Sequence, residues 1–165
     1  MQAEGPLLTI AQISVALAGF SSVVIALRGA GPDAWSAQDR AGLANVLAAS
    51  VGTLVGSLLP FPLAYLGWPD ARVWGVVNAL FGALVLGVVG VLAYQVTRGS
   101  RPRTPRIFWS FVSSGFALGA LLLLSAVDLG VPRGPALLLF GFLWALLAAF
   151  AQLATFLVLT WSDRR

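Results

Sequence analysis

Five long stretches of this chain carry no charged residue, and they constrain its fold more than any other feature. They are residues 5–27, 41–69, 73–97, 107–127 and 134–162. Each stretch reaches the length of about 20 apolar residues that a helix needs to cross the hydrocarbon core of a bilayer. Lipid offers no partner to backbone N–H and C=O groups, so each stretch is expected to be helical.

We therefore predict an all-α integral membrane bundle of five transmembrane helices that forms a single domain over 1–165. The helices are expected at about 7–27, 41–66, 73–97, 107–127 and 135–161.

The composition is typical of a membrane protein and excludes several kinds of chemical group. Of the 165 residues, 59% are hydrophobic and 10% are charged, whereas about a quarter of an ordinary soluble domain is charged. The chain has no Cys, no His and no Lys. Disulfides, histidine general bases and lysine Schiff bases are therefore excluded. Because no acidic side chain lies inside a predicted span, carboxylate-coupled proton pumping is disfavoured. We predict no catalytic residue, no cofactor and no metal site, and expect that the protein is not an enzyme.

The arginines orient the predicted helices. With five spans, the segments 28–40 and 98–106 and the C-terminal tail share one side and hold eight of the ten arginines. Short loops rich in Arg face the cytoplasm, which places the N-terminus outside and the C-terminus inside. The Arg-only, Ala/Gly/Leu-rich usage is typical of bacteria with GC-rich genomes, so the cytoplasmic (inner) membrane is the expected location.

The first stretch is expected to be a retained helix rather than a cleaved signal peptide. Ala16-Leu17-Ala18 offers a small-residue cleavage pattern. However, Glu4 lies where a signal peptide has positive charge, and the apolar run of about 21 residues exceeds a usual signal-peptide core.

Two prolines interrupt the second stretch. Pro60 and Pro62 lack the backbone N–H that would bond to Gly56 and Leu58. Either the helix continues with a kink, or it ends near Leu59 and the following residues lie at the membrane interface. The pattern allows both.

Four amide side chains fall at membrane depth and are the candidate intramembrane polar contacts: Gln12, Asn45, Asn78 and Gln152. Gln12 and Asn78 lie at equal depth from one side, and Asn45 and Thr155 from the other, so each pair would meet if its helices touch. Polar side chains of this kind hold helices together or line a substrate or ion site. Both interpretations remain open.

The loop after the third predicted helix is strongly basic. Arg98, Arg101, Arg103 and Arg106 occur without an acidic residue, and each arginine near an anionic bilayer surface adds about 1 kcal/mol of attraction. We expect these four side chains to contact anionic lipid. The loop is too short for a nucleic-acid-binding module, and no nucleic-acid partner is predicted.

Small residues repeat at helical spacing. Gly52–Gly56 and Gly115–Gly119 are GxxxG pairs, which allow helix backbones to approach closely in lipid. The last stretch instead carries large apolar side chains on several faces, and we expect it to meet lipid or a partner.

The first quarter of the chain resembles small uncharacterised bacterial multi-pass membrane proteins. The resemblance rests on Ala16-Leu17-Ala18-Gly19-Phe20, on Val23-Val24-Ile25-Ala26-Leu27-Arg28, and on Trp35 and Asp39-Arg40. It implies the same membrane class and carries no function.

Three functions fit these features. The first is an accessory or scaffold subunit of a larger inner-membrane assembly, which binds the lipid bilayer and other membrane subunits or further copies of itself. The alternative is a small oligomeric channel or transporter whose interior is lined by amides and hydroxyls. A third is the binding of an apolar pigment or lipid.

Overall fold

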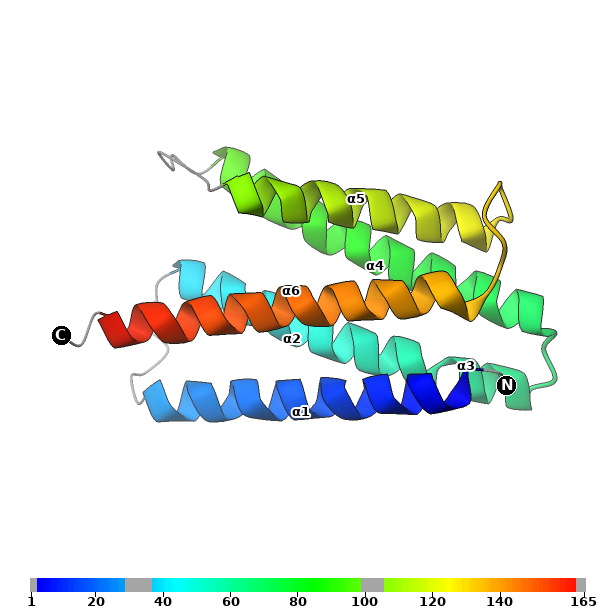
Figure 1. Ribbon diagram of the computed structural model, residues 1–165, viewed down its shortest axis with the longest axis horizontal. Helices are drawn as coiled ribbons and strands as arrows, with labels where there is room; N and C mark the ends of the chain where they lie inside the picture. Colours follow the sequence, from blue (N-terminus) through cyan, green and yellow to red (C-terminus); the bar gives the residue numbers. More distant parts are fainter. Residues whose placement is uncertain (1–2, 29–36, 99–105, 163–165) are drawn as a thin grey trace. The chain divides into compact units, whose positions relative to one another are not determined.

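A computed structural model describes residues 3–28, 37–98 and 106–162, and these residues form helices, turns and no strand. The helices are α1 (Glu4–Arg28), α2 (Ala37–Leu58), α3 (Pro60–Tyr65), α4 (Asp70–Arg98), α5 (Arg106–Ala126) and α6 (Pro135–Ser162) (Figure 1). The predicted all-α class is confirmed.

Five helical segments are long and apolar enough to span a membrane. They are Glu4–Val24, Gly42–Tyr65, Asp70–Arg98, Phe108–Ala126 and Pro135–Ala154. The prediction of five helices long and apolar enough to span a membrane is confirmed, which is consistent with a multi-pass membrane protein.

α1, α2 and α4 begin a few residues before the predicted spans, and charged residues occupy both ends of α4. Asp70 and Arg72 lie in the first turn of α4, and Arg98 is its last residue. A charged side chain at a helix end reaches water while its backbone stays hydrogen-bonded. The acidic group also suits the N-terminal end of the helix dipole and the basic group the C-terminal end.

The prolines end the second long helix. α2 stops at Leu58 and the six-residue α3 begins at Pro60, with Pro at its first position. Leu59 keeps right-handed helical dihedral angles (φ −58°, ψ −34°), so the backbone continues in a helical direction from α2 into α3. Because Pro60 has no N–H group, the series of backbone hydrogen bonds is interrupted at this point. One candidate span, Gly42–Tyr65, covers both helices, so the choice between a kinked helix and an ending at the membrane interface stays a prediction.

The chain forms two compact units. We name residues 58–141 the central unit, and residues 1–57 with 142–165 the terminal unit. The first turns of α6 belong to the central unit and the remainder of that helix to the terminal unit. The predicted single domain stays a prediction.

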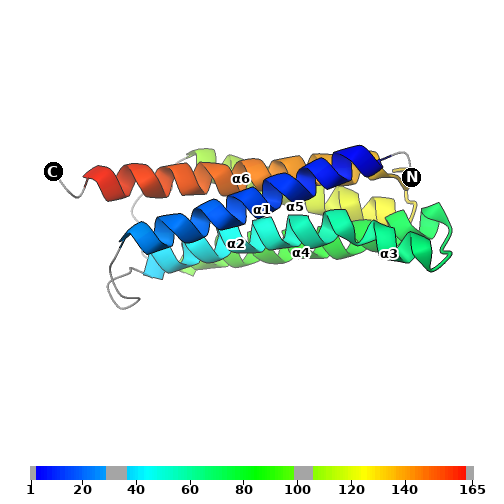
Figure 2. The same cartoon turned by 90° about the horizontal axis from the view of Figure 1, so that it is seen from below.

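α4 and α5 pack as an antiparallel pair in the central unit (Figure 1), and α3 contacts α4 near its first turns (Figure 2). Glycines allow the close approach of the pair. A Cβ atom on Gly82 would lie 3.0 Å from Leu122 Cβ and 3.1 Å from the Gly119 carbonyl oxygen. A Cβ atom on Gly119 would meet the Leu86 side chain at 2.7 Å. The predicted packing role of small residues therefore holds for Gly119.

α1 in the terminal unit buries one narrow stripe of residues at alternating spacings of four and three. The stripe consists of Ala3, Leu7, Ile10, Ser14, Leu17, Ser21 and Val24. Along α2 the buried stripe has the same spacing and is rich in hydroxyl groups. It consists of Val46, Ser50, Thr53 and Ser57. This spacing is that of helices that pack at a shallow left-handed angle.

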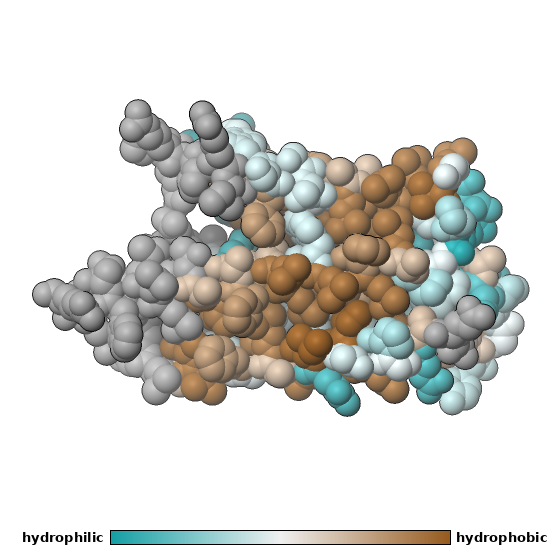
Figure 3. Space-filling view, viewed as in Figure 1, coloured by the Kyte–Doolittle hydropathy of each residue, from teal (hydrophilic) through white to brown (hydrophobic). Residues whose placement is uncertain are grey.

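The outward faces of the long helices are apolar. Only 28–39% of each candidate span is buried. α6 exposes four bulky side chains at heptad spacing, which we name the α6 stripe: Phe140, Leu143, Leu147 and Phe150, each at least 50% exposed. The apolar surface over α6 is visible in Figure 3. The prediction that the last helix contacts lipid or a partner protein stays a prediction, with both alternatives open.

Candidate functional site

One predicted amide lies at the centre of a hydrogen-bonded cluster in the central unit. Asn78 lies two turns into α4 and is fully buried. Its Nδ2 donates to the Ser125 hydroxyl oxygen at 3.1 Å and to the Gly134 carbonyl oxygen at 3.4 Å. The amide therefore connects α4 both to the last turn of α5 and to the residue before α6.

Ser125 continues the cluster. Its hydroxyl donates to the Pro132 carbonyl oxygen at 3.0 Å while it accepts the bond from Asn78. Asp128 and Gly130 have positive φ angles of 63° and 71°, which reverse the chain direction between the two helices. The cluster thus holds the whole connection 127–134 against α4.

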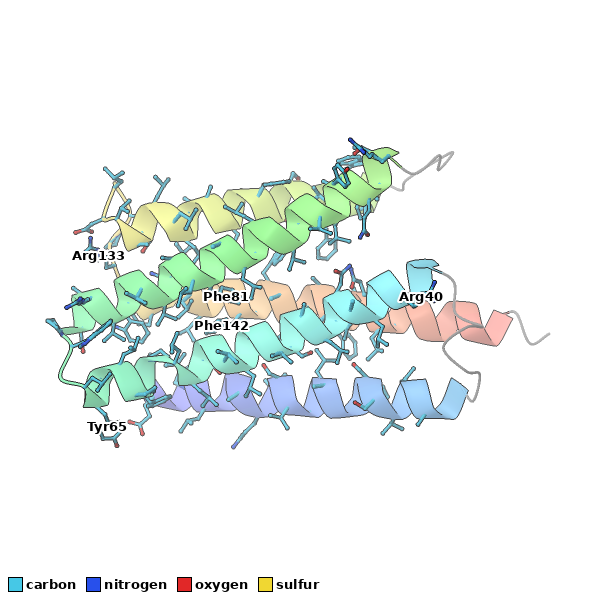
Figure 4. All side chains as sticks on the ribbon, turned by 180° about the vertical axis from the view of Figure 1, so that it is seen from behind. Arg40, Tyr65, Phe81, Arg133 and Phe142 are labelled. Carbon is cyan, nitrogen blue, oxygen red and sulfur yellow. The ribbon has the colours of Figure 1, made fainter. Side chains whose placement is uncertain are left out.

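Gly75 makes the close contact at this end possible. A Cβ atom there would lie 3.3 Å from the Ala126 carbonyl oxygen and 3.8 Å from the Arg133 side chain. Figure 4 shows Arg133 at the end of the central unit where α4 begins. Because glycine has no side chain, the end of α5 and the Arg133 side chain approach the α4 backbone directly.

One atom of the cluster lacks a partner. Asn78 Oδ1 is buried and accepts no hydrogen bond from the described residues. An amide oxygen has two lone pairs and accepts hydrogen bonds from N–H or O–H groups. The interactions of this cluster are hydrogen bonds between the Asn78 amide, the Ser125 hydroxyl and two backbone carbonyl groups.

The buried hydroxyls of the terminal unit bond to their own helices. Ser14 donates to Ile10 O at 2.8 Å, and Ser50 donates to Val46 O at 2.9 Å. The same local pattern holds for Ser21, Thr53 and Ser57. These groups are satisfied without a second helix.

The other three predicted amides lie in the terminal unit. Gln12 is exposed, and Asn45 and Gln152 are half-buried. Their side chains form no hydrogen bond among the described residues. The Gln12–Asn78 and Asn45–Thr155 pairs stay predictions, and the Thr155 side chain lies outside the described residues.

The predicted lipid-contacting arginines are only partly described. Arg98 is exposed, and its guanidinium lies 4.6 Å from the centre of the Tyr94 ring. Arg101 and Arg103 lie outside the described residues, and Arg106 begins α5 with its side chain outside them. At the opposite end of α4, the Arg72 guanidinium lies 4.3 Å from the Trp68 ring centre.

Within the described ranges, no group of three or more His, Cys, Asp or Glu side chains is placed to hold a metal ion. Comparison with protein-family models, with curated proteins and with solved structures finds no match to this chain. The resemblance of the first quarter of the chain therefore stays a prediction.

Reasoning from sequence missed Ser125 and the carbonyl groups of Pro132 and Gly134 as partners of Asn78. The position of Ser125 in the sequence could have indicated that it lies near Asn78. α4 and α5 are antiparallel and their connection is centred near residue 102, so Ser125 lies opposite Asn78 by position along the pair. The carbonyl groups carry no such signal, because they depend on the path of the 127–134 connection.

Proposed function

We propose that this chain is a non-enzymatic multi-pass membrane protein that serves as an accessory or scaffold subunit of a larger membrane assembly. The use of its buried polar side chains carries the proposal. Asn78 and Ser125 fasten α4, α5 and the 127–134 connection to one another, and the buried hydroxyls bond to their own helices. Polar groups used in this way stabilise the helical fold of the chain itself.

The uncovered apolar faces support the same proposal. The α6 stripe is 50–70% exposed along its four side chains, which suits contact with lipid tails or with the apolar helices of other subunits. A scaffold subunit has such surface on several helices, and α1, α4 and α5 expose large apolar side chains as well.

The proposed location is the bacterial inner membrane, with the N-terminus outside and the C-terminus in the cytoplasm. The eight arginines on one predicted side support this orientation. The chain has no natural cysteine, so single cysteines report topology without background. We expect Leu129→Cys to react with a membrane-impermeant maleimide in intact cells, and Ser100→Cys to react only after permeabilisation. The reverse pattern would contradict the orientation.

Purification and mass measurement test the scaffold role. The chain is tagged at its own locus, extracted with its surrounding lipid and measured by native mass spectrometry. We expect a complex that contains a second protein in fixed stoichiometry, and the level of that protein should fall when the chain is deleted. A lone monomer under the same gentle conditions would count decisively against the proposal.

Two observations, one in each unit, favour the alternative, an oligomeric channel or transporter. The buried stripe of α2 carries Ser50, Thr53 and Ser57, and Asn78 Oδ1 lacks a hydrogen-bond donor among the described residues. Flux of small neutral solutes and ions into liposomes that contain the purified chain tests this function. Flux reduced by Thr53→Val but unchanged by Ser22→Ala, an exposed hydroxyl on α1, would support a channel. Liposomes as tight as protein-free controls would exclude it for the solutes tested.

A further inference from the structure

The amide oxygen of Asn78 is a buried acceptor whose hydrogen bonding the described residues leave incomplete. Asn78 is fully buried, and its Nδ2 group donates to Ser125 and to Gly134. The Ser125 hydroxyl in turn donates to Pro132 O. Buried polar atoms in folded proteins almost always have a partner, which is either another protein atom or an ordered water molecule.

The hydrogen bonds of the cluster determine which way the amide points. Gly134 O is a carbonyl oxygen and only accepts, so the amide atom that bonds to it must be Nδ2. The Ser125 hydroxyl uses its hydrogen for Pro132 O and therefore accepts from Asn78 as well. Turning the amide by 180° would place its oxygen against another carbonyl oxygen. Oδ1 is thus the atom that needs a donor.

Open space adjoins the cluster at Gly134. This residue is half-buried, and a Cβ atom built on it would meet no atom within 4 Å. By contrast, a Cβ atom on Gly75, one turn before Asn78 in α4, would lie 3.3 Å from Ala126 O. The cluster is therefore closely packed where α5 meets α4 and open beside the residue that precedes α6.

The other side of the cluster is closed by apolar side chains. Phe81 follows Asn78 by one turn in α4, and Leu122 precedes Ser125 by one turn in α5. Both are buried, and both lie against Gly141 of α6, whose Cβ atom would be 3.0 Å from the Phe81 ring and 3.4 Å from Leu122. A polar molecule at the cluster would have no polar partner beyond this layer.

We propose that Asn78 Oδ1 binds an internal water molecule, held between the amide and the carbonyl groups of the 127–134 connection. Water has two hydrogens, so it donates one to Oδ1 and the other to Pro132 O or Gly134 O. Each of these carbonyl oxygens accepts one bond in the cluster and has a second lone pair. Internal water needs about two to four polar partners, and the cluster supplies them. This site does not depend on the scaffold role.

Arg133 is the other donor near the cluster. Its Nε and Cδ atoms would lie 3.8 Å from a Cβ atom on Gly75, one turn closer to the start of α4 than Asn78. The Arg133 side chain is exposed. Placing its guanidinium at Oδ1 would move a charge from an exposed to a buried position, whereas a water molecule is neutral and small. The arrangement therefore favours water as the donor.

Solid-state NMR of the chain in lipid vesicles tests the site. The chain contains two asparagines, Asn45 and Asn78, so isotopic labelling of asparagine alone gives two side-chain signals, and Asn45→Gln assigns them. We expect magnetisation from water to reach the Asn78 side-chain amide sooner than the backbone amide of the same residue, which is bonded within α4. If the side chain receives it no sooner, or contacts the Arg133 guanidinium instead, the proposal is overturned.

A pair of glycine variants locates the water. Gly134→Val places methyl groups in the open space beside the cluster, and we expect loss of the early transfer to the Asn78 side chain. The matched control is Gly87→Val, at a glycine that also has open space but lies nine positions after Asn78 in α4. It should leave the transfer unchanged. Equal transfer in the two variants would overturn the placement of the water beside Gly134.

Discussion

The two compact units use their buried polar side chains in opposite ways. In the central unit, Asn78 and Ser125 bond to atoms on other segments, 47 and 7 positions away along the chain. In the terminal unit, Ser14 and Ser50 bond to carbonyl groups four positions earlier in their own helices. A buried polar group therefore does not by itself indicate a contact between helices.

The difference follows from side-chain length and backbone separation. A serine hydroxyl easily reaches the carbonyl one turn earlier, so it is satisfied wherever it lies on a helix. The Asn78 amide instead bonds to atoms on other segments. The glycine contacts at Gly75 and Gly82 bring α5 close enough to α4 for Asn78 to reach Ser125.

The largest effect is expected from filling the α4–α5 contact. Gly82→Val places its Cβ about 3 Å from Leu122 Cβ and the Gly119 carbonyl oxygen, neither of which can move without shifting backbone. We expect a loss of about 3 kcal/mol of unfolding free energy, at the upper end of typical overpacking costs. Reversible unfolding in mixed detergent micelles measures it.

Gly87→Val is the matched control on the same helix. A Cβ atom at Gly87 would meet no atom within 4 Å, so the change should cost less than about 0.5 kcal/mol. Equal losses for the two variants would mean that α4 and α5 do not pack through Gly82.

A smaller effect is expected at the polar cluster. Asn78→Leu removes the donor to Ser125 and Gly134, so the buried Ser125 hydroxyl oxygen loses the bond that it accepts. We expect about 2 kcal/mol of destabilisation, as for other buried hydrogen bonds that lose one partner. The same unfolding assay measures it, and a neutral result would show that the cluster does not hold the 127–134 connection.

Ser125→Ala is expected to cost about 1 kcal/mol, because only the bonds through its hydroxyl are lost. Combined with Asn78→Leu, the two losses should fall short of their sum, since both variants remove the same bond. Strict additivity in this double-mutant cycle would contradict the 3.1 Å bond.

The smallest effect is expected in the terminal unit. Ser14→Ala and Ser50→Ala each remove a bond to the helix's own carbonyl group, which is already bonded within the ladder. We expect changes within about 0.5 kcal/mol, because such bonds contribute little to helix stability. If either variant lost as much unfolding free energy as Asn78→Leu, the two units would not differ in how their buried polar side chains contribute to stability.

The charge pattern of the sequence was enough to predict the five apolar spans, because charges rarely enter an apolar core. It was less informative about helix ends, since Asp70 and Arg98 belong to α4 rather than to the loops. The two prolines indicated an interruption without deciding its form, because the dihedral angles at Leu59 depend on surrounding packing.

The position of a residue along its helix can be predicted from the sequence. The direction in which its side chain points around the helix axis cannot. Gln12 and Asn78 are predicted to lie at equal depth in a bilayer, and this stays a prediction; in the structure Gln12 is exposed and Asn78 is fully buried. The partners of Asn78, Ser125 and Gly134, depend on which face α4 turns toward α5.

The arginine–aromatic pairs at the ends of α4 have a consequence for bilayer thickness. Arg72 and Arg98 are 26 positions apart in α4, which corresponds to about 39 Å along the axis. That separation matches a bilayer including part of its headgroup regions, and α5 is eight residues shorter. If α4 spans a bilayer as proposed, a thinner one requires it to tilt to keep both pairs at the water boundary, so hydrophobic mismatch would favour thicker membranes.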